Sequence, residues 1–439
     1  MLTLSQKLAA YKHGNALQAI SVLWLGTVGG SLLAVSTKVV LARTLEVEQF
    51  GEFSAALATV TLAAALAGFG VPGFWLYSYG KEGWNAGRWL PGSFRFLKLS
   101  AGTSVAVILL WAWLGPHGAG TALVLSVLAA FVVGQAMVEL AGAKFQLEGR
   151  HTRLAIWQFT PHALRFTGAL VVLIAALLLE LEANALHAAV AFSAASLIVF
   201  LIGVRELAKM PGGSFRLEGH GGRPERTEGN RPGAIAVLRH AWLFGATSAL
   251  YIVYLQSSIV FLRYFVGEHE AGLFAGAMLV MLAVYLLPMV VYKKFFLPRM
   301  HRWAHHEKER LARVYYGGNR AMLLLGAVFA VGILLLARPM VPIVFGQSYR
   351  GAAPVLMVLA LAAPFRFFAA GAGAVITTGG LVRAKMVIMA LAAGANVALN
   401  LALIPRFGLL GAAVAVVATE AGLAIAFHAR IRAHFARVL

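Results

Sequence analysis

Long apolar stretches separated by short polar segments dominate the pattern of residues along this chain. A helix needs about 20 apolar residues to cross ~30 Å of hydrocarbon at ~1.5 Å per residue. Twelve stretches meet that requirement: residues 17–42, 53–77, 97–114, 121–141, 154–179, 184–204, 240–266, 271–292, 320–337, 352–378, 386–404 and 409–429. The pattern therefore predicts an all-α polytopic membrane protein with about twelve transmembrane helices.

Basic residues concentrate on one side of these predicted helices. With a cytoplasmic N-terminus, 29 of the 37 Lys and Arg residues fall in cytoplasmic segments and five fall in outer segments. This bias is the positive-inside signal of membrane proteins, and one miscounted span would scramble it. We therefore predict that both termini are cytoplasmic. The polar N-terminal segment has no small-residue cleavage site after a short apolar core, so no cleaved signal peptide is expected.

Composition narrows the classes of function. The 439 residues are 60% hydrophobic and 12% charged, with a formal net charge of +20. In a soluble protein that charge would suggest nucleic-acid binding, but here topology explains it, and no nucleic-acid partner is predicted. The chain has no cysteine, which excludes disulfides, thiolate metal sites and cysteine nucleophiles. All 17 acidic residues are Glu.

One polar segment divides the chain into halves. Residues 205–239 are rich in Gly, Pro and charged residues, which predicts a flexible cytoplasmic linker. It would connect an N-terminal six-helix bundle, residues 1–204, to a C-terminal six-helix bundle, residues 240–439.

A second basic segment, residues 293–320, predicts a helical connector at the cytoplasmic surface. It contains His301, His305 and His306. Positions 301 and 305 share a helix face, but no third buried ligand accompanies them, so a solvated face is favoured and no metal site is predicted.

The two halves resemble each other in sequence. "LARTLEVEQFGEFSAA" (41–56) aligns with "FLRYFVGEHEAGLFAGA" (261–277) after one insertion, and "HAAVAFSAAS" (187–196) aligns with "GAAVAVVATE" (411–420). The first alignment matches Arg43 with Arg263, Gly51 with Gly272 and Phe53 with Phe274. Each half has an even number of spans, so both copies enter the membrane in the same direction. Parallel repeats of this kind are related by an axis along the membrane normal, with a transport site between them near the midplane.

These motifs also resemble a known family. "LARTLEVEQFGEFSAALATVTLAAALAGFG" (41–70), "VFGQSYRGAAPVLMVLALAAPF" (344–365) and "ANVALNLALIPRFGLLGAAVAVVATE" (395–420) are similar to the polysaccharide-transporter branch of the multidrug/oligosaccharidyl-lipid/polysaccharide (MOP) exporter superfamily. That branch includes O-antigen (Wzx-type) flippases. The resemblance covers nearly the whole chain. It implies a bacterial inner-membrane protein whose two six-helix bundles form a V around a central cavity with alternating access.

The resemblance also implies a substrate and partners. Members of this family move undecaprenyl-pyrophosphate-linked oligosaccharides, the repeat units of O-antigen, capsule or exopolysaccharide, from the cytoplasmic to the periplasmic leaflet. The expected partners are that lipid-linked oligosaccharide and the lipid bilayer, with polysaccharide polymerase machinery as a further candidate. No cofactor is expected. Many relatives carry an Asp in span 7, where this chain has Ser257 and Ser258.

Three basic residues fall inside predicted spans. Arg165 and Arg366 are deep in spans 5 and 10, and each follows a proline closely. An Arg at a span centre costs about 2.5–3.5 kcal/mol on insertion scales, so it faces a protein interior or a wet cavity by default. A guanidinium fork suits phosphate or carboxylate, which makes both residues candidate substrate-binding cations, with structural pairing as the alternative. Lys38 is one turn from the outer end of span 1, so it either reaches the membrane surface or faces the cavity.

Two acidic residues, Glu139 and Glu420, also fall inside predicted spans. Burial favours the protonated form of a carboxyl group, so either residue could carry a coupling proton. Either could equally neutralise a neighbouring Arg. No catalytic residue is predicted.

Two other functions compete with the flippase. A multidrug or organic-cation antiporter of the same superfamily would need acidic groups in its cavity, and this chain has few to offer. A membrane-embedded glycosyl-processing enzyme would need an outer domain or paired acids, but outer loops such as 115–120 and 404–408 are short. We therefore predict that the protein is not an enzyme.

The aromatic segment 73–89 predicts an interfacial belt, with a sugar-stacking platform as the alternative.

Overall fold

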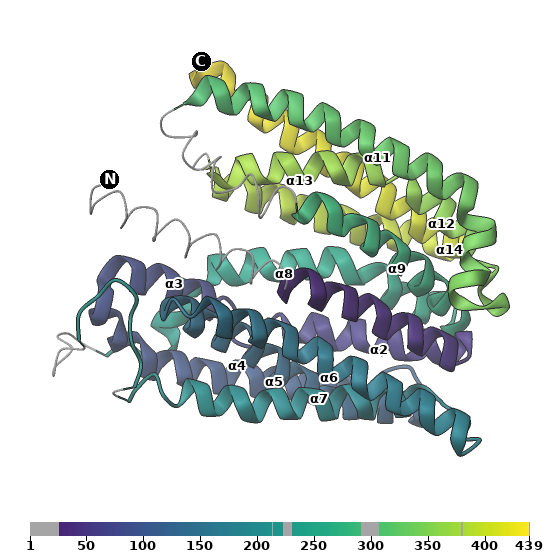
Figure 1. Cartoon of the computed structure of the whole chain (residues 1–439), viewed down its shortest axis with the longest axis horizontal. Helices are drawn as coiled ribbons and strands as arrows, with labels where there is room; N and C mark the ends of the chain where they lie inside the picture. The colour runs from purple at the N-terminus through teal and green to yellow at the C-terminus, as the bar shows by residue number, and fades with distance from the viewer. Residues whose placement is uncertain (1–25, 213, 223–230, 291–306, 379–380, 439) are drawn as a thin grey trace, which may run out of the picture.

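The computed structural model is helical along nearly all of its described length (Figure 1). It describes residues 26–212, 214–222, 231–290, 307–378 and 381–438. In the first half, a helix over residues 26–44 precedes α2 (Val47–Ala64), α3 (Val71–Glu82), η1 (Gly83–Trp89), α4 (Leu90–Leu114), α5 (Ala119–Leu147), α6 (His151–Leu178) and α7 (Ala185–Leu207). The second half contains α8 (Ala234–Phe265), α9 (Glu268–Val290), α11 (Lys308–Phe345), η3 (Gln347–Tyr349), α12 (Ala352–Ala360), α13 (Ala363–Thr378) and α14 (Val382–Val438).

The helices form two bundles arranged as a V. One arm holds the helices up to α7, and the other holds α9 to α14, with α8 between them (Figure 1). The arms meet where residues 41–53 lie against residues 263–274, which we call the closed end. They diverge toward the end that carries residues 208–222. The predicted all-α fold with two bundles arranged as a V is therefore confirmed.

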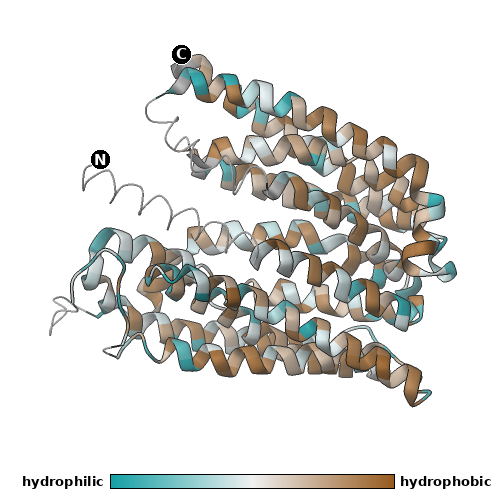
Figure 2. Cartoon of the chain, viewed as in Figure 1, coloured by the Kyte–Doolittle hydropathy of each residue, from teal (hydrophilic) through white to brown (hydrophobic). Residues whose placement is uncertain are grey.

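The surface of the bundles is apolar along the helices. Hydrophobic residues cover their length, while hydrophilic residues gather at helix ends and connections (Figure 2). Leu114 and Leu335, for example, are 80% and 75% exposed. Such exposure is unfavourable in water and favourable in lipid. The chain is a multi-pass membrane protein.

Eight helices in the described residues are long and apolar enough to cross a membrane, or nine if the bent pair α12–α13 counts as one span. This count is below twelve partly because it joins α3 to α4 and treats α14 as one helix. In α14, Gly408 has a non-helical conformation with φ 52° and ψ −129°. The last two predicted spans therefore lie on either side of this kink.

The second predicted span, 53–77, is broken rather than continuous. Residues 65–70 separate α2 from α3, and Gly68 and Gly70 have φ values of 74° and 78°. A Cβ on Gly70 would lie 2.3 Å from the carbonyl oxygen of Ala241 in α8. The break therefore lets the chain turn where α8 passes closest to it.

Two predicted cytoplasmic segments are more structured than expected. Residues 308–319 belong to the long helix α11 instead of a separate surface connector, while the three histidines of that segment lie outside the described residues. The flexible linker predicted at 205–239 is packed along its first third. Met210, Phe215 and Leu217 are buried, and Trp84 donates a 2.9 Å hydrogen bond from Nε1 to the carbonyl oxygen of Gly221.

The aromatic segment 73–89 packs inward instead of forming a belt. Phe74, Trp75, Tyr79 and Trp89 are all buried. The Tyr79 ring makes an edge contact with Phe215 at 5.7 Å between ring centroids. Most of these rings therefore hold the end of the first bundle and the packed part of the linker together, which leaves little surface for stacking sugars.

Candidate functional site

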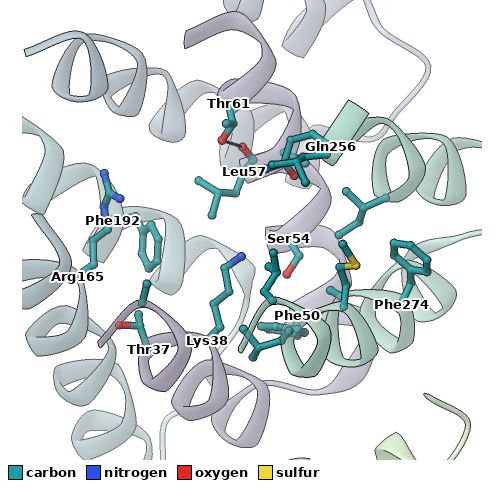
Figure 3. A pocket seen from close by; sticks show the side chains of 18 of the residues that line it. Thr37, Lys38, Phe50, Ser54, Leu57, Thr61, Arg165, Phe192, Gln256 and Phe274 are labelled. Atoms are coloured by element: carbon teal, nitrogen blue, oxygen red, sulfur yellow. Dashed lines mark hydrogen bonds between the residues drawn. The ribbon is translucent and has the colours of Figure 1, made fainter. Parts of the chain in front are cut away.

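A cavity of about 260 Å³ lies between the two bundles. Its walls come from the helix over residues 26–44, α2, α5, α6 and α7 of the first half and from α8 and α9 of the second. Most of its lining is apolar and includes Phe50 and Phe274, which belong to the two stretches that meet at the closed end (Figure 3). This is the place between the repeats where a transport site was predicted.

Lys38 and Arg165 both line this cavity. The Lys38 side chain extends into the space bordered by Ser54, Leu57 and Phe192 (Figure 3). From the sequence, Lys38 could either reach the membrane surface or face the cavity. In the structure it faces the cavity. Its helix packs closely on α6, because a Cβ on Gly30 would lie 2.9 Å from the His162 ring.

Arg165 lies between two aromatic rings. Its guanidinium carbon is 4.6 Å from the ring centroid of Phe131 and 5.6 Å from that of Phe192. Cation–π contacts of this kind stabilise the charge without using the N–H donors. Arg165 Nε is buried and has no hydrogen-bond partner. This N–H donor therefore has no partner among the described residues.

No carboxylate lines the cavity among the described residues, and its other polar lining side chains include His162, Thr37 and Gln256. The two basic groups are therefore not neutralised within the cavity wall. A charge removed from water without a partner is costly, so an anion that enters this cavity gains a favourable interaction with both groups.

Arg366 has a different environment in the second bundle. Its Nη1 lies 3.1 Å from Oε1 of Glu420, and its Nη2 donates a 3.1 Å hydrogen bond to the hydroxyl of Tyr251. Tyr254 also donates a hydrogen bond to Oε1 of Glu420. The Glu420 side chain is 1% exposed and that of Arg366 is 18% exposed. Structural pairing, the alternative considered for both residues, is therefore present here.

The Arg366 pair still lies close to the cavity. Tyr251, its hydrogen-bond partner, is exposed and lies four residues before Leu255, which lines the cavity. Residues four apart share a helix face, so Tyr251 lies on the face of α8 that is directed toward the cavity. Arg366 is thus a neutralised cation beside a cavity that already contains two unneutralised ones.

Glu139 is not part of this pair. It lies on α5, eight residues after Phe131, and is not one of the residues that line the cavity. Its side chain is exposed and hydrogen-bonded to Gln135, and it forms no ion pair in the described part of the chain. The structure therefore does not bring Glu139 and Glu420 together.

A polar network that the sequence did not predict surrounds Ser257, where many relatives have Asp. Ser257 donates a 2.7 Å hydrogen bond to Oδ1 of Asn396, which also accepts one of 2.9 Å from Asn400. Asn396 donates to Oγ1 of Thr419 at 3.1 Å. The one sign of this network in the sequence is a pair of asparagines, Asn396 and Asn400, four residues apart in an apolar span.

The family model described as "Polysaccharide biosynthesis protein" matches residues 16–76. No curated protein sequence matches the chain.

Solved structures of similar fold cover nearly the whole chain. A lipid II flippase MurJ in an inward closed conformation superposes with a TM-score of 0.73 at 11% identity, over 93% of this chain and 87% of the other. An inward-facing MATE-family multidrug resistance transporter of the MOP superfamily gives 0.66 at 14% identity, over 93% and 95%. A MOP superfamily transporter from Pyrococcus furiosus, described as having a binding pocket of reverse polarity, gives 0.58 at 15% identity, over 95% of each chain.

The chain shares the fold of these solved flippase and transporter structures, and residues 16–76 match the family model of polysaccharide biosynthesis proteins. The resemblance seen in the sequence is therefore confirmed.

Proposed function

We propose that this protein is a flippase of the bacterial inner membrane that moves an undecaprenyl-pyrophosphate-linked oligosaccharide from the cytoplasmic to the periplasmic leaflet. The observation that carries the proposal is the cavity between the bundles, which contains Lys38 and Arg165 and is lined by no carboxylate of the described residues. A pyrophosphate headgroup needs fixed positive charge in such a place. An organic cation would be repelled there.

The two basic residues suit different parts of such a headgroup. The planar fork of Arg165 can donate two parallel hydrogen bonds to a phosphate, and the aromatic rings on either side limit its rotation. Lys38 supplies a flexible point charge from the neighbouring helix. Two separated cations bind an anion less tightly than one dense cluster, which favours release on the other side. The polyprenyl tail, which is apolar, remains in the surrounding lipid.

The likeness to a lipid II flippase and the match to a polysaccharide biosynthesis family support this substrate class. Deletion of the gene is expected to deplete a surface polysaccharide and to leave its lipid-linked unit on the cytoplasmic leaflet. An unchanged surface polysaccharide, with no accumulated lipid-linked unit, would contradict the proposal.

The proposed orientation, with both termini in the cytoplasm, can be tested with single cysteines because the chain has none. Gly118 and Gly221 are suitable positions, since an added Cβ would have no atom within 4 Å at either. A membrane-impermeant thiol reagent is expected to label position 118 in intact spheroplasts and position 221 only after lysis. The reverse pattern would invert the orientation.

We further propose that Glu139 carries a coupling proton, because it is a carboxyl group inside a membrane span that has no ion-pair partner among the described residues and lies about two helical turns from Phe131 in the cavity wall. Glutamine resembles the protonated form, so Glu139→Gln is expected to abolish the dependence of transport on a pH gradient. Glu182→Gln, at an exposed position outside the spans, serves as the control. If Glu139→Gln combined with Glu420→Gln keeps the full gradient dependence, neither residue carries the proton.

A further inference from the structure

The two bundles cross at a pair of glycines at the closed end. A Cβ on Gly51 of α2 would lie 1.8 Å from the carbonyl oxygen of Glu268 and 2.6 Å from the amide nitrogen of Gly272. A Cβ on Gly272 of α9 would lie 2.1 Å from the carbonyl oxygen of Val47. Real Cβ atoms do not approach other atoms this closely. The backbones of α2 and α9 are therefore in direct contact, and only glycine permits that contact from either side.

Two arginines connect the bundles next to this crossing. Arg43 donates a 2.7 Å hydrogen bond from Nε to the carbonyl oxygen of Val344, and a second from Nη2 to that of Ile343. Both carbonyls belong to the last turn of α11, where helical carbonyls lack intrahelical partners and the helix dipole attracts a cation.

Arg263 makes the reciprocal connection. Its Nη2 donates 2.6 Å hydrogen bonds to Thr121 of α5 and to Glu268 of its own half. Thr121 in turn donates a 2.6 Å hydrogen bond to the buried carboxylate of Glu52. Thus an arginine from each half contacts the opposite bundle.

The residues that make these contacts occupy equivalent positions in the two repeats. The sequence alignment matches Gly51 with Gly272 and Arg43 with Arg263. In each half, the helix that carries the arginine is followed by two residues outside any helix and then by the helix that carries the glycine. The same two elements therefore occur twice, once in each bundle, and face each other across the approximate axis between the repeats.

Aromatic contacts lie around the crossing. Phe50 and Tyr349 come from opposite bundles, with ring centroids 6.2 Å apart, and Trp111 Nε1 donates a 2.9 Å hydrogen bond to the hydroxyl of Tyr264. Phe50 also lines the central cavity, so this layer of contacts at the closed end borders the cavity.

We propose that the layer made by Gly51, Gly272, Arg43 and Arg263 is the gate that closes the cavity on this side, and that each repeat supplies one half of it. Opening toward this side must separate the glycines and break both arginine contacts, while the Arg263–Glu268 pair can persist within one bundle. The gate rests on the proposed function only in taking alternating access as the mechanism, and it requires no particular substrate.

The test uses a single cysteine at Ser54, which lines the cavity just beyond the glycine crossing. A membrane-impermeant thiol reagent is applied from the side that labels a cysteine at position 118, and the labelling rate is measured. In this background, Arg43→Ala and Arg263→Ala are each expected to raise the rate about tenfold, the factor that corresponds to about 1.4 kcal/mol. Arg406→Ala removes an exposed arginine of the second half and should leave the rate unchanged.

Valine at Gly51 or Gly272 should also raise the labelling rate, because the closed crossing cannot accept a side chain. Gly102→Val is the matched control, since an added Cβ there meets no atom within 4 Å. If a glycine variant does not insert, the arginine variants decide the question. If both arginine variants are labelled at the same rate as the parent, the gate proposal is wrong. Because no substrate is added, this assay can succeed even if the flippase proposal fails, and the reverse also holds.

Discussion

Replacement of Arg165 with alanine is expected to reduce transport about 10- to 100-fold, because a hydrogen-bonded charge contributes roughly 1.5–3 kcal/mol to binding. The loss should appear with normal amounts of inserted protein. Arg165 contacts the rings of Phe131 and Phe192 and has no ion pair with any described residue, so its removal should have a limited effect on folding. The measurement is the initial rate of lipid-linked oligosaccharide translocation, with protein quantified in the same vesicles.

Three further variants make this prediction specific. Arg165→Lys keeps the charge without the fork and should restore transport only partly. Lys38→Ala, which removes the other basic group that lines the cavity, should also reduce transport. Arg153→Ala removes an exposed arginine of the same helix and should have little effect. Full transport by a well-inserted Arg165→Ala protein would remove Arg165 from the substrate site.

The largest loss of stability is expected from Glu420→Ala. Removing one member of a buried ion pair leaves the other charge without a partner, which costs about 3–5 kcal/mol. Here the residue left behind is Arg366, whose side chain is only 18% exposed. The unfolding temperature of the purified protein in detergent should fall accordingly, while Glu309→Ala, at an exposed position of α11, should leave it nearly unchanged.

A double variant separates the pair from the individual charges. Arg366→Met combined with Glu420→Leu removes both charges, so it should be more stable than Glu420→Ala alone. If the double variant is the less stable of the two, the pair is not what stabilises this part of the bundle. Because Glu420 already neutralises Arg366 in this conformation, we also expect Arg366→Ala to reduce transport less than Arg165→Ala does.

Hydropathy and charge bias were sufficient to predict the membrane spans and the two bundles, because each span must satisfy its own backbone and expose apolar side chains to lipid. The break at residues 65–70 was not predicted. Glycines are common in these spans, and nothing local distinguishes Gly70 from the others. Its conformation depends on the approach of α8, a helix more than 160 residues further along the chain.

The candidate site could be predicted only in part from the sequence. The cost of a charge in a span pointed to Lys38, Arg165, Arg366, Glu139 and Glu420, but not to their partners. The pairing of Arg366 with Glu420 joins α13 to α14, and the packing of Arg165 on Phe131 joins α6 to α5. The rotation of each helix about its axis decides these contacts, and that rotation is set by packing between helices.

The gate shows what the repeat adds to such a prediction. The alignment matched Arg43 with Arg263 and Gly51 with Gly272 without indicating that they meet. Their meeting follows from the approximate symmetry between the bundles, which brings equivalent positions together near its axis.

The most direct measurement of the central claim is translocation in vesicles that contain only this protein. A labelled undecaprenyl-pyrophosphate-linked oligosaccharide is placed in one leaflet, and its arrival in the other is followed, with export of a cationic dye measured in parallel. The account predicts translocation of the glycolipid that depends on Arg165, with no export of the dye. Export of the dye without translocation of the native glycolipid would contradict it and would favour the multidrug antiporter.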